Sequence, residues 1–145
     1  MGVPPSRIID LAASSIDAQR IFAATFSGLL VSEDGGYSWR PTGGRPKCRQ
    51  PVMAVDTGTD GAVYAYSLCA GLIRGDEATD TWTVVNDRFG GCIIQHLAVD
   101  PQNSAQVYAV LGCRKVLVSD DMGLTWRALG SQRMWEPDCA TNSTG

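Results

Sequence analysis

The stretch Ser32-Glu33-Asp34-Gly35-Gly36-Tyr37-Ser38-Trp39 returns later in the chain as Ser119-Asp120-Asp121-Met122-Gly123-Leu124-Thr125-Trp126. A more divergent copy, Gly75-Asp76-Glu77-Ala78-Thr79-Asp80-Thr81-Trp82, lies between them. The tryptophans that end the three copies are 43 and 44 residues apart. A repeat of this length is typical of a chain built from one supersecondary unit per repeat, each packed on its neighbours.

Each repeat contains four short segments rich in β-branched and aromatic residues, separated by Gly, Pro, Asn and Asp. No segment shows sustained helical spacing, and several expected strands are apolar on both faces, as in sheets that lie between other sheets. The expected strands are 8–13, 20–25, 28–31 and 38–41, then 52–56, 62–66, 71–73 and 81–85, then 93–99, 106–111, 115–119 and 125–129.

We therefore predict an all-β fold of three four-stranded antiparallel, propeller-like blades. The blades span about 7–43, 50–87 and 92–130, within a single domain over 1–131 that is followed by a tail over 132–145. A β-sandwich of similar hairpins is the alternative, but a sandwich does not require every unit to repeat the same turn chemistry.

The repeated octapeptide has the chemistry of a turn between the third and fourth strands of each unit. An Asp in a turn accepts hydrogen bonds from backbone N–H groups that the ladder cannot satisfy. Gly36 and Gly123 can take positive φ at little steric cost. The closing tryptophan supplies a large ring to bury between sheets.

This pattern, Ser-x-Asp-x-Gly-x-Thr-Trp, resembles the Asp-box, or BNR repeat. The first copy departs from it only at Ser38, the third not at all, and the middle one keeps Thr81 and Trp82. The resemblance implies a β-propeller of the kind found in sialidases, xyloglucan-active glucanases, sortilin-like receptors and photosystem II assembly factors. It also implies structural rather than catalytic roles for Ser32, Asp34, Gly36, Trp39, Glu77, Trp82, Ser119, Asp121, Gly123 and Trp126.

The cysteines follow the same period. Cys48 and Cys92 are 44 residues apart, as are Cys69 and Cys113, and each pair within a blade is separated by 21 residues. We predict disulfides Cys48–Cys69 and Cys92–Cys113, with reduced cysteines as the alternative and zinc less favoured because there is no C-x-x-C spacing. Disulfides favour an extracellular or periplasmic location, although the chain shows no signal peptide. Cys139 would need a partner beyond residue 145 or in another chain.

Three blades are fewer than the four to eight of closed propellers, so two sheet faces would be left open. Two copies could associate head-to-tail into a six-bladed ring, which we favour. Alternatively, the chain is a fragment of a larger propeller, or a compact arrangement capped by Met134 and Trp135 in the tail.

The net charge of −3 and the lack of a basic cluster argue against nucleic-acid binding, and no apolar run reaches the ~18 residues of a membrane span. The single histidine, His96, lies with Gln95 on an expected innermost strand, where both are candidates for lining a central channel; a core histidine is the alternative. No cofactor or metal is predicted. Carboxylates outside the repeated turns are Asp10, Asp56, Asp60, Asp76, Asp87, Asp100, Glu136 and Asp138, of which Asp56 and Asp100 are 44 residues apart and are expected to be equivalent turn residues.

These features favour a non-catalytic binding or scaffold module that recognises a protein or glycan through its loop face or central channel. The alternative is a carbohydrate-active, glycosidase- or sialidase-like propeller fragment, or a site assembled between subunits, since glycoside hydrolysis needs two positioned carboxylates.

Overall fold

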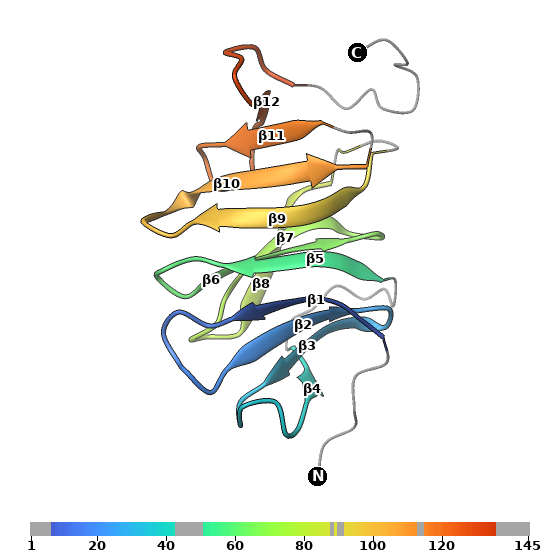
Figure 1. Ribbon diagram of the computed structural model, residues 1–145, viewed down its shortest axis with the longest axis vertical. Coiled ribbons are helices and arrows are strands. Elements are labelled where there is room, and N and C mark those ends of the chain that lie inside the picture. The colour runs from blue at the N-terminus through green and yellow to red at the C-terminus, as the bar shows by residue number, and fades with distance from the viewer. Residues whose placement is uncertain (1–6, 43–50, 88, 90–91, 113–114, 136–145) are drawn as a thin grey trace.

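The computed structural model describes residues 7–42, 51–87, 89, 92–112 and 115–135. Its strands form three four-stranded antiparallel sheets (Figure 1), which confirms the predicted all-β class and the four strands per repeat. The strands are β1 Ile8–Ala13, β2 Ile21–Thr25, β3 Gly28–Ser32 and β4 Arg40–Pro41, then β5 Val52–Thr57, β6 Ala62–Ser67, β7 Gly71–Asp76 and β8 Thr81–Asn86, then β9 Ile94–Asp100, β10 Asn103–Leu111, β11 Val116–Ser119 and β12 Arg127–Ala128. The described residues include no helix long and apolar enough to cross a membrane.

Each sheet is a simple meander in which every strand pairs with the next one along the chain. The three sheets follow one another along the long axis of the molecule, and their first strands, β1, β5 and β9, lie side by side (Figure 1). These are therefore the innermost strands of three propeller-like blades.

The outer strands differ in length from the expectation. β4 and β12 have two residues each, because the acidic turns before them use Ser38, Trp39 and their counterparts for turn hydrogen bonds. β8 keeps six residues after the divergent middle copy of the turn. β10 begins at Asn103, three residues earlier than expected, with a register shift between Asn103 and Val107.

The apolar residues form one core between the first and second sheets and another between the second and third. All six residues of β6 are buried, because alternate side chains enter the two cores. Val63 and Ala65 pack toward the first sheet, and Tyr64 and Tyr66 pack toward the third. The expectation of strands that are apolar on both faces is met most fully in this central strand.

Aromatic side chains connect each sheet to the next. Phe22 in β2 meets the Trp82 ring edge-on, at 6.5 Å between centroids. In the second core, Phe89 lies 5.9 Å from both Tyr66 and Trp126. Such edge-to-face pairs add to the free energy gained from burial alone.

Residues after β12 turn back along it. Met134 forms an antiparallel bridge with Arg127, and the Trp135 ring lies 5.8 Å from that of Phe89. Trp135 thus packs at the core between the second and third sheets, while Met134 stays 60% exposed.

Candidate functional sites: the acidic turns and the innermost strands

The first acidic turn, Ser32–Trp39, is closed by its own side chains. The Ser32 hydroxyl donates to Asp34 Oδ1 at 2.8 Å and accepts the Gly36 backbone N–H at 2.8 Å. Asp34 also accepts the Ser38 backbone N–H at 2.9 Å and the Ser38 hydroxyl. The Trp39 indole donates to the Gly36 carbonyl at 3.1 Å. Gly35 and Gly36 both have positive φ, which explains glycine at these positions.

The third acidic turn, Ser119–Trp126, repeats these bonds. Ser119 donates to Asp121 at 2.7 Å and accepts from Gly123, and Asp121 accepts the Thr125 backbone N–H at 2.9 Å and the Thr125 hydroxyl. The Trp126 indole donates to the Gly123 carbonyl at 2.8 Å. Two sequence copies 87 residues apart therefore fold into the same hydrogen-bonded turn.

Both turn aspartates are held in their ionised form. Hydrogen bonds from the Ser38 side chain and backbone and from Ser32 lower the pKa of Asp34 to about 2. Burial alone would raise the pKa of Asp121, but hydrogen bonds from Thr125 and Ser119 lower it. Carboxylates with such low pKa values are poor general acids at neutral pH, because they are almost never protonated there.

The middle turn, Gly75–Trp82, is arranged differently. Glu77, aligned with Asp34, does not bond within its own turn; it accepts the Ser14 hydroxyl and forms an ion pair with Arg20 at 2.7 Å, both from the first sheet's β1–β2 connection. Its side chain is fully buried. Asp80 instead accepts the Trp82 indole N–H at 2.9 Å. The structure thus places Glu77 as a bridge between the first and second sheets.

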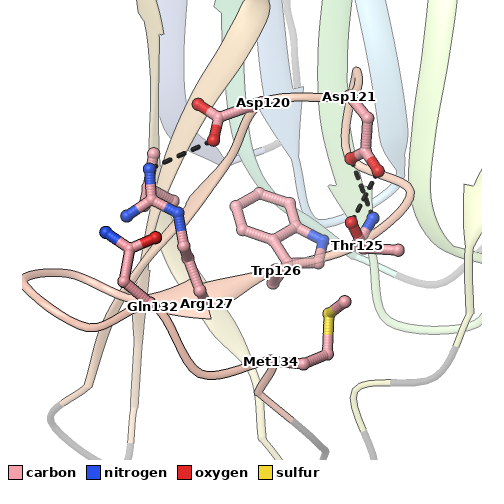
Figure 2. Close-up of a pocket in the computed structure, with 8 residues that line it drawn as sticks. Asp120, Asp121, Thr125, Trp126, Arg127, Gln132 and Met134 are labelled. Carbon is pink, nitrogen blue, oxygen red and sulfur yellow. Dashed lines mark hydrogen bonds and ion pairs between the residues drawn. The ribbon is translucent and has the colours of Figure 1, made fainter.

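A small pocket of about 180 Å³ lies beside the third acidic turn (Figure 2). Asp120 and Arg127 form an ion pair of 3.1 Å on one side, and Met134 approaches the Trp126 ring from the other. The volume is below the ~300 Å³ at which pockets for drug-sized ligands begin. Asp121 already accepts a hydrogen bond from Thr125, so it offers this pocket little capacity to bind the polar groups of a small-molecule ligand.

The innermost strands carry two carboxylates that reach across to the next sheet. Asp10 in β1 accepts the Val55 backbone N–H of β5 at 3.1 Å, and Asp56 in β5 accepts the Val99 N–H of β9 at 2.7 Å. Burial raises the pKa of Asp56, and the nearby negative charge of Asp10 adds to the rise. Of the described carboxylates, this neighbouring pair comes nearest to a general acid and base.

The expected equivalence of Asp56 and Asp100 is wrong. Asp56 pairs with Tyr64 in mid-strand, whereas the repeat counterpart of Tyr64, Tyr108, pairs with Ala98. Asp100 lies at the β9–β10 turn, where it accepts the Gln102 backbone N–H at 2.8 Å. The register shift in β10 makes this hairpin longer than the β5–β6 hairpin. Residues of β5 and β9 that are 44 positions apart therefore do not occupy the same register position.

Gln95 and His96 lie on the innermost strand β9, and both are exposed. The alternative of a core histidine is therefore wrong. His96 pairs with Val110, at the register position that Asp10 has in the first sheet. Since Asp10 reaches the sheet that follows its own, His96 lies on the face of the third sheet that points away from the second sheet.

Two other described carboxylates also have structural partners. Asp60, between β5 and β6, accepts the Ser104 hydroxyl of β10 at 2.7 Å and so joins the second sheet to the third. Asp76 accepts the Ala78 N–H at 2.9 Å within its own turn. Glu136 and Asp138 lie outside the described residues. Within the described part of the chain, no group of three or more His, Cys, Asp and Glu could hold a metal ion.

Two of the cysteines can be described. Cys69, in the β6–β7 turn, and Cys92, buried before β9, are both disulfide-bonded. Cys48, Cys113 and Cys139 lie outside the described residues, so the pairs Cys48–Cys69 and Cys92–Cys113 remain predictions.

The bonds between sheets were missed by sequence reasoning. Asp10, Arg20 and Glu77 break the repeat, since their counterparts in the other units are different residue types or have other partners. For Asp10 the available signal was a charged residue on an otherwise apolar strand, and for Glu77 it was the departure from the Asp that the other two turns carry.

No protein-family model and no curated protein matches this chain. Among solved structures, YCF48 bound to D1 peptide matches at TM-score 0.69 and 15% identity over 88% of this chain and 42% of that one. YCF48 from Cyanidioschyzon merolae matches at 0.68 and 20% over 88% and 38%. The GH74 xyloglucanase from Xanthomonas campestris matches at 0.56 and 28% over 77% and 19%.

The chain spans less than half the length of each of these structures. At such identities the likeness is one of fold, and it agrees with the three meander sheets and the side-by-side first strands. The chain therefore has the fold of part of a β-propeller.

Proposed function

We propose that this protein is a non-catalytic binding or scaffold module that recognises a protein segment or a glycan through the inner edges and loops of its blades. The acidic turns are proposed to be Asp-boxes of the BNR type, which lock the outer strands of the blades. The observation that carries the proposal is the exposure of Gln95 and His96 on the innermost strand β9. The blades of a closed propeller surround a central channel, and their innermost strands lie nearest to it.

The hydrogen bonds that the carboxylates already accept within the protein support a non-catalytic role. Asp34 and Asp121 are committed to turn hydrogen bonds and held ionised, and Asp10 and Asp56 accept backbone N–H groups of the next sheet. Carboxylates that hold the backbone in this way are less available to reacting substrate.

A protein ligand is favoured over a glycan because YCF48, a solved structure with the same fold, binds D1 peptide. An extended peptide offers backbone groups and side chains to exposed amide and imidazole groups such as those of Gln95 and His96. A homo-oligomer in which two copies complete a six-sheet ring is part of the same proposal, since it would enclose the inner strands in a channel.

The test is binding of the labelled full-length chain to a random-sequence peptide array and to a glycan array. We expect peptide ligands whose affinity falls at least about tenfold in a Gln95→Ala, His96→Ala double variant. Gln102→Ala is the matched control, because Gln102 is exposed at the β9–β10 turn rather than on the inner edge. Peptide binding that the double variant leaves unchanged would contradict the proposed site.

A carbohydrate-active module is the second candidate, and the Asp10–Asp56 pair with its raised Asp56 pKa favours it. Hydrolysis assays on sialosides and β-glucans test this candidate. Turnover that disappears in Asp56→Asn but persists in Asp60→Asn would replace the binding proposal with an enzymatic one.

A further inference from the structure

The three sheets are stacked in one direction, so each has two distinct faces. We call the face that points to the next sheet along the chain the forward face, and the opposite one the rear face. Phe22 and Tyr64 lie on forward faces, since they enter the first and second cores. Tyr108 has the same register position in the third sheet, so it lies on a forward face that no further sheet of the described residues covers.

An apolar residue on this forward face is exposed, although the residues at the same register position in the other two sheets are buried. Leu29 and Leu72, on the forward faces of the first two sheets, are 2% and 0% exposed. Val116 has the equivalent register position in the third sheet and is 40% exposed. The sequence thus keeps an apolar residue where the other two sheets bury one.

Tyr108 also repeats half of a hydrogen-bonded contact between sheets. The Tyr64 hydroxyl accepts from Arg74 Nε at 3.2 Å and donates to the Ser104 carbonyl of the third sheet at 2.7 Å. The Tyr108 hydroxyl accepts from Gln106 Nε2 at 3.0 Å, and no acceptor for its proton is found among the described residues. An incoming sheet with a backbone carbonyl at this position would complete the bond.

The rear face of the first sheet is also exposed at a position where the other two sheets bury an apolar residue. Val55 and Leu97, on the rear faces of the second and third sheets, are 2% and 8% exposed, whereas their counterpart Leu11 is 54% exposed. Trp39 is half-buried, while its counterpart Trp126 is 3% exposed in the second core. Among the described residues, one forward face and one rear face therefore have no sheet packed on them.

We infer that the forward face of sheet β9–β12 docks onto the rear face of sheet β1–β4 of a second copy of this chain. The two interfaces inside the chain are both forward-to-rear contacts made by the same register positions, and the two open faces are the two halves of one more such contact. The inference rests on the homo-oligomer of the proposed function and names the surfaces that form it.

The internal contacts specify how the two copies meet. Trp82, on the rear face of the second sheet, packs against Phe22 of the first. By the same register, Trp39 of the second copy packs against Tyr108. Val118, which pairs with Tyr108 and lines the pocket near the third acidic turn, is already only 1% exposed within one chain. Each copy offers both faces, so two copies form two equivalent contacts and close a ring if the rotation between successive sheets permits it.

Light scattering after size-exclusion chromatography of the full chain tests the inference. We expect a mass of twice 15.5 kDa that shifts to one chain in both Val116→Glu and Leu11→Glu, with dimer dissociation constants raised at least about tenfold. Val84→Glu is the matched control, because Val84 is 53% exposed on the outer strand β8, and it should stay dimeric.

Mixing the two variants separates loss of an interface from loss of folding. Val116→Glu keeps an intact rear face and Leu11→Glu keeps an intact forward face, so each alone is monomeric, but together they form a one-to-one dimer. Two folded variants, checked by circular dichroism, that do not combine would overturn the inference.

The remaining outcomes are distinguishable. A wild-type monomer overturns both the docking inference and the proposed homo-oligomer, whereas peptide binding by that monomer leaves the binding function standing. A dimer that survives both glutamate variants overturns only the assignment of the faces. Open polymers instead of a dimer overturn the closed ring.

Discussion

At the scale of single residues, the same alignment position serves two different purposes. Asp34 and Asp121 close their own turns, while Glu77, one methylene longer, leaves its turn to pair with Arg20 of the neighbouring sheet. The change of residue in the middle copy therefore exchanges a local hydrogen-bond network for an ion pair between sheets. Because the Glu77 side chain is fully buried, removing Arg20 would leave a buried charge without its cation.

The low pKa of Asp34 predicts a fall in stability in acid. Its folded pKa of about 2 is below the ordinary value of 3.8, so its stabilising contribution is present above 3.8 and is lost as the pH falls through 2. Urea denaturation at pH 5, 3 and 2 should show a smaller loss in Asp34→Asn than in the wild type, because that variant has no carboxylate to protonate.

Asp56→Asn is the control variant, because the stability contribution of Asp56 is expected to depend on pH in the opposite direction to that of Asp34. Burial raises the pKa of Asp56, so its contribution is present below the ordinary value and is lost as the pH rises through the raised folded pKa. Asp56→Asn should therefore be at least as stable as the wild type at neutral pH, whereas Asp34→Asn should be less stable. Identical pH profiles for the two variants would contradict this account.

At the scale of elements, the turn decides the length of the outer strand. In the first and third sheets, the acidic turn occupies the residues up to the tryptophan, and only two ladder residues follow. In the middle copy Thr79 replaces the turn glycine, the side-chain hydrogen bonds of the other two turns do not form, and β7 and β8 pair from Asp76 and Thr81 onward. Composition alone predicted strands of similar length in all three units.

Two glycines at the start of third strands provide a matched test of packing. Gly28 and Gly71 both have positive φ, but a Cβ on Gly28 meets no atom within 4 Å, whereas one on Gly71 comes within 2.6 Å of the Asn86 carbonyl oxygen. Gly28→Ala should cost about 1 kcal/mol for backbone strain, and Gly71→Ala about 2 kcal/mol more, because β8 must move. Thermal or urea unfolding measures both, and equal losses would show that β8 shifts without cost.

At the scale of the whole molecule, the central sheet holds the fold together. It contributes to both cores, and every residue of β6 is buried. The flanking sheets each pack on one face, so their tryptophans are in unequal surroundings although they end equivalent turns. Trp126 is 3% exposed, and Trp39 is half-buried.

Replacement of these tryptophans should separate folding from assembly. Trp126→Ala should cost about 3–5 kcal/mol of unfolding free energy, because it empties a buried site, and Trp39→Ala should cost less. Both are best compared by urea unfolding in the Val116→Glu background, where docking is not expected. In the wild-type background, Trp39→Ala should weaken the dimer; an equal cost for both in the monomer would argue against an open rear face.

Most of the strands could be predicted from sequence, because β-branched runs and turn residues are local signals. β1, β2, β5 and β6 begin and end within one residue of the expected bounds. The candidate site was only partly predictable. The inner position of Gln95 and His96 followed from strand order, but their exposure did not, because burial depends on which sheet lies beside β9.

The sequence by itself determined the repeat, the all-β class, the four strands per unit and the residues able to close the acidic turns. These follow from spacing, propensity and hydrogen bonds between residues a few positions apart. Only the tertiary structure decided that Glu77 pairs with Arg20, that Asp10 and Asp56 bond to the next sheet, and that Leu11 and Val116 lie on open faces. The physical reason is that these contacts join residues from different sheets, whose relative placement is set by packing across the two cores and not by local backbone chemistry.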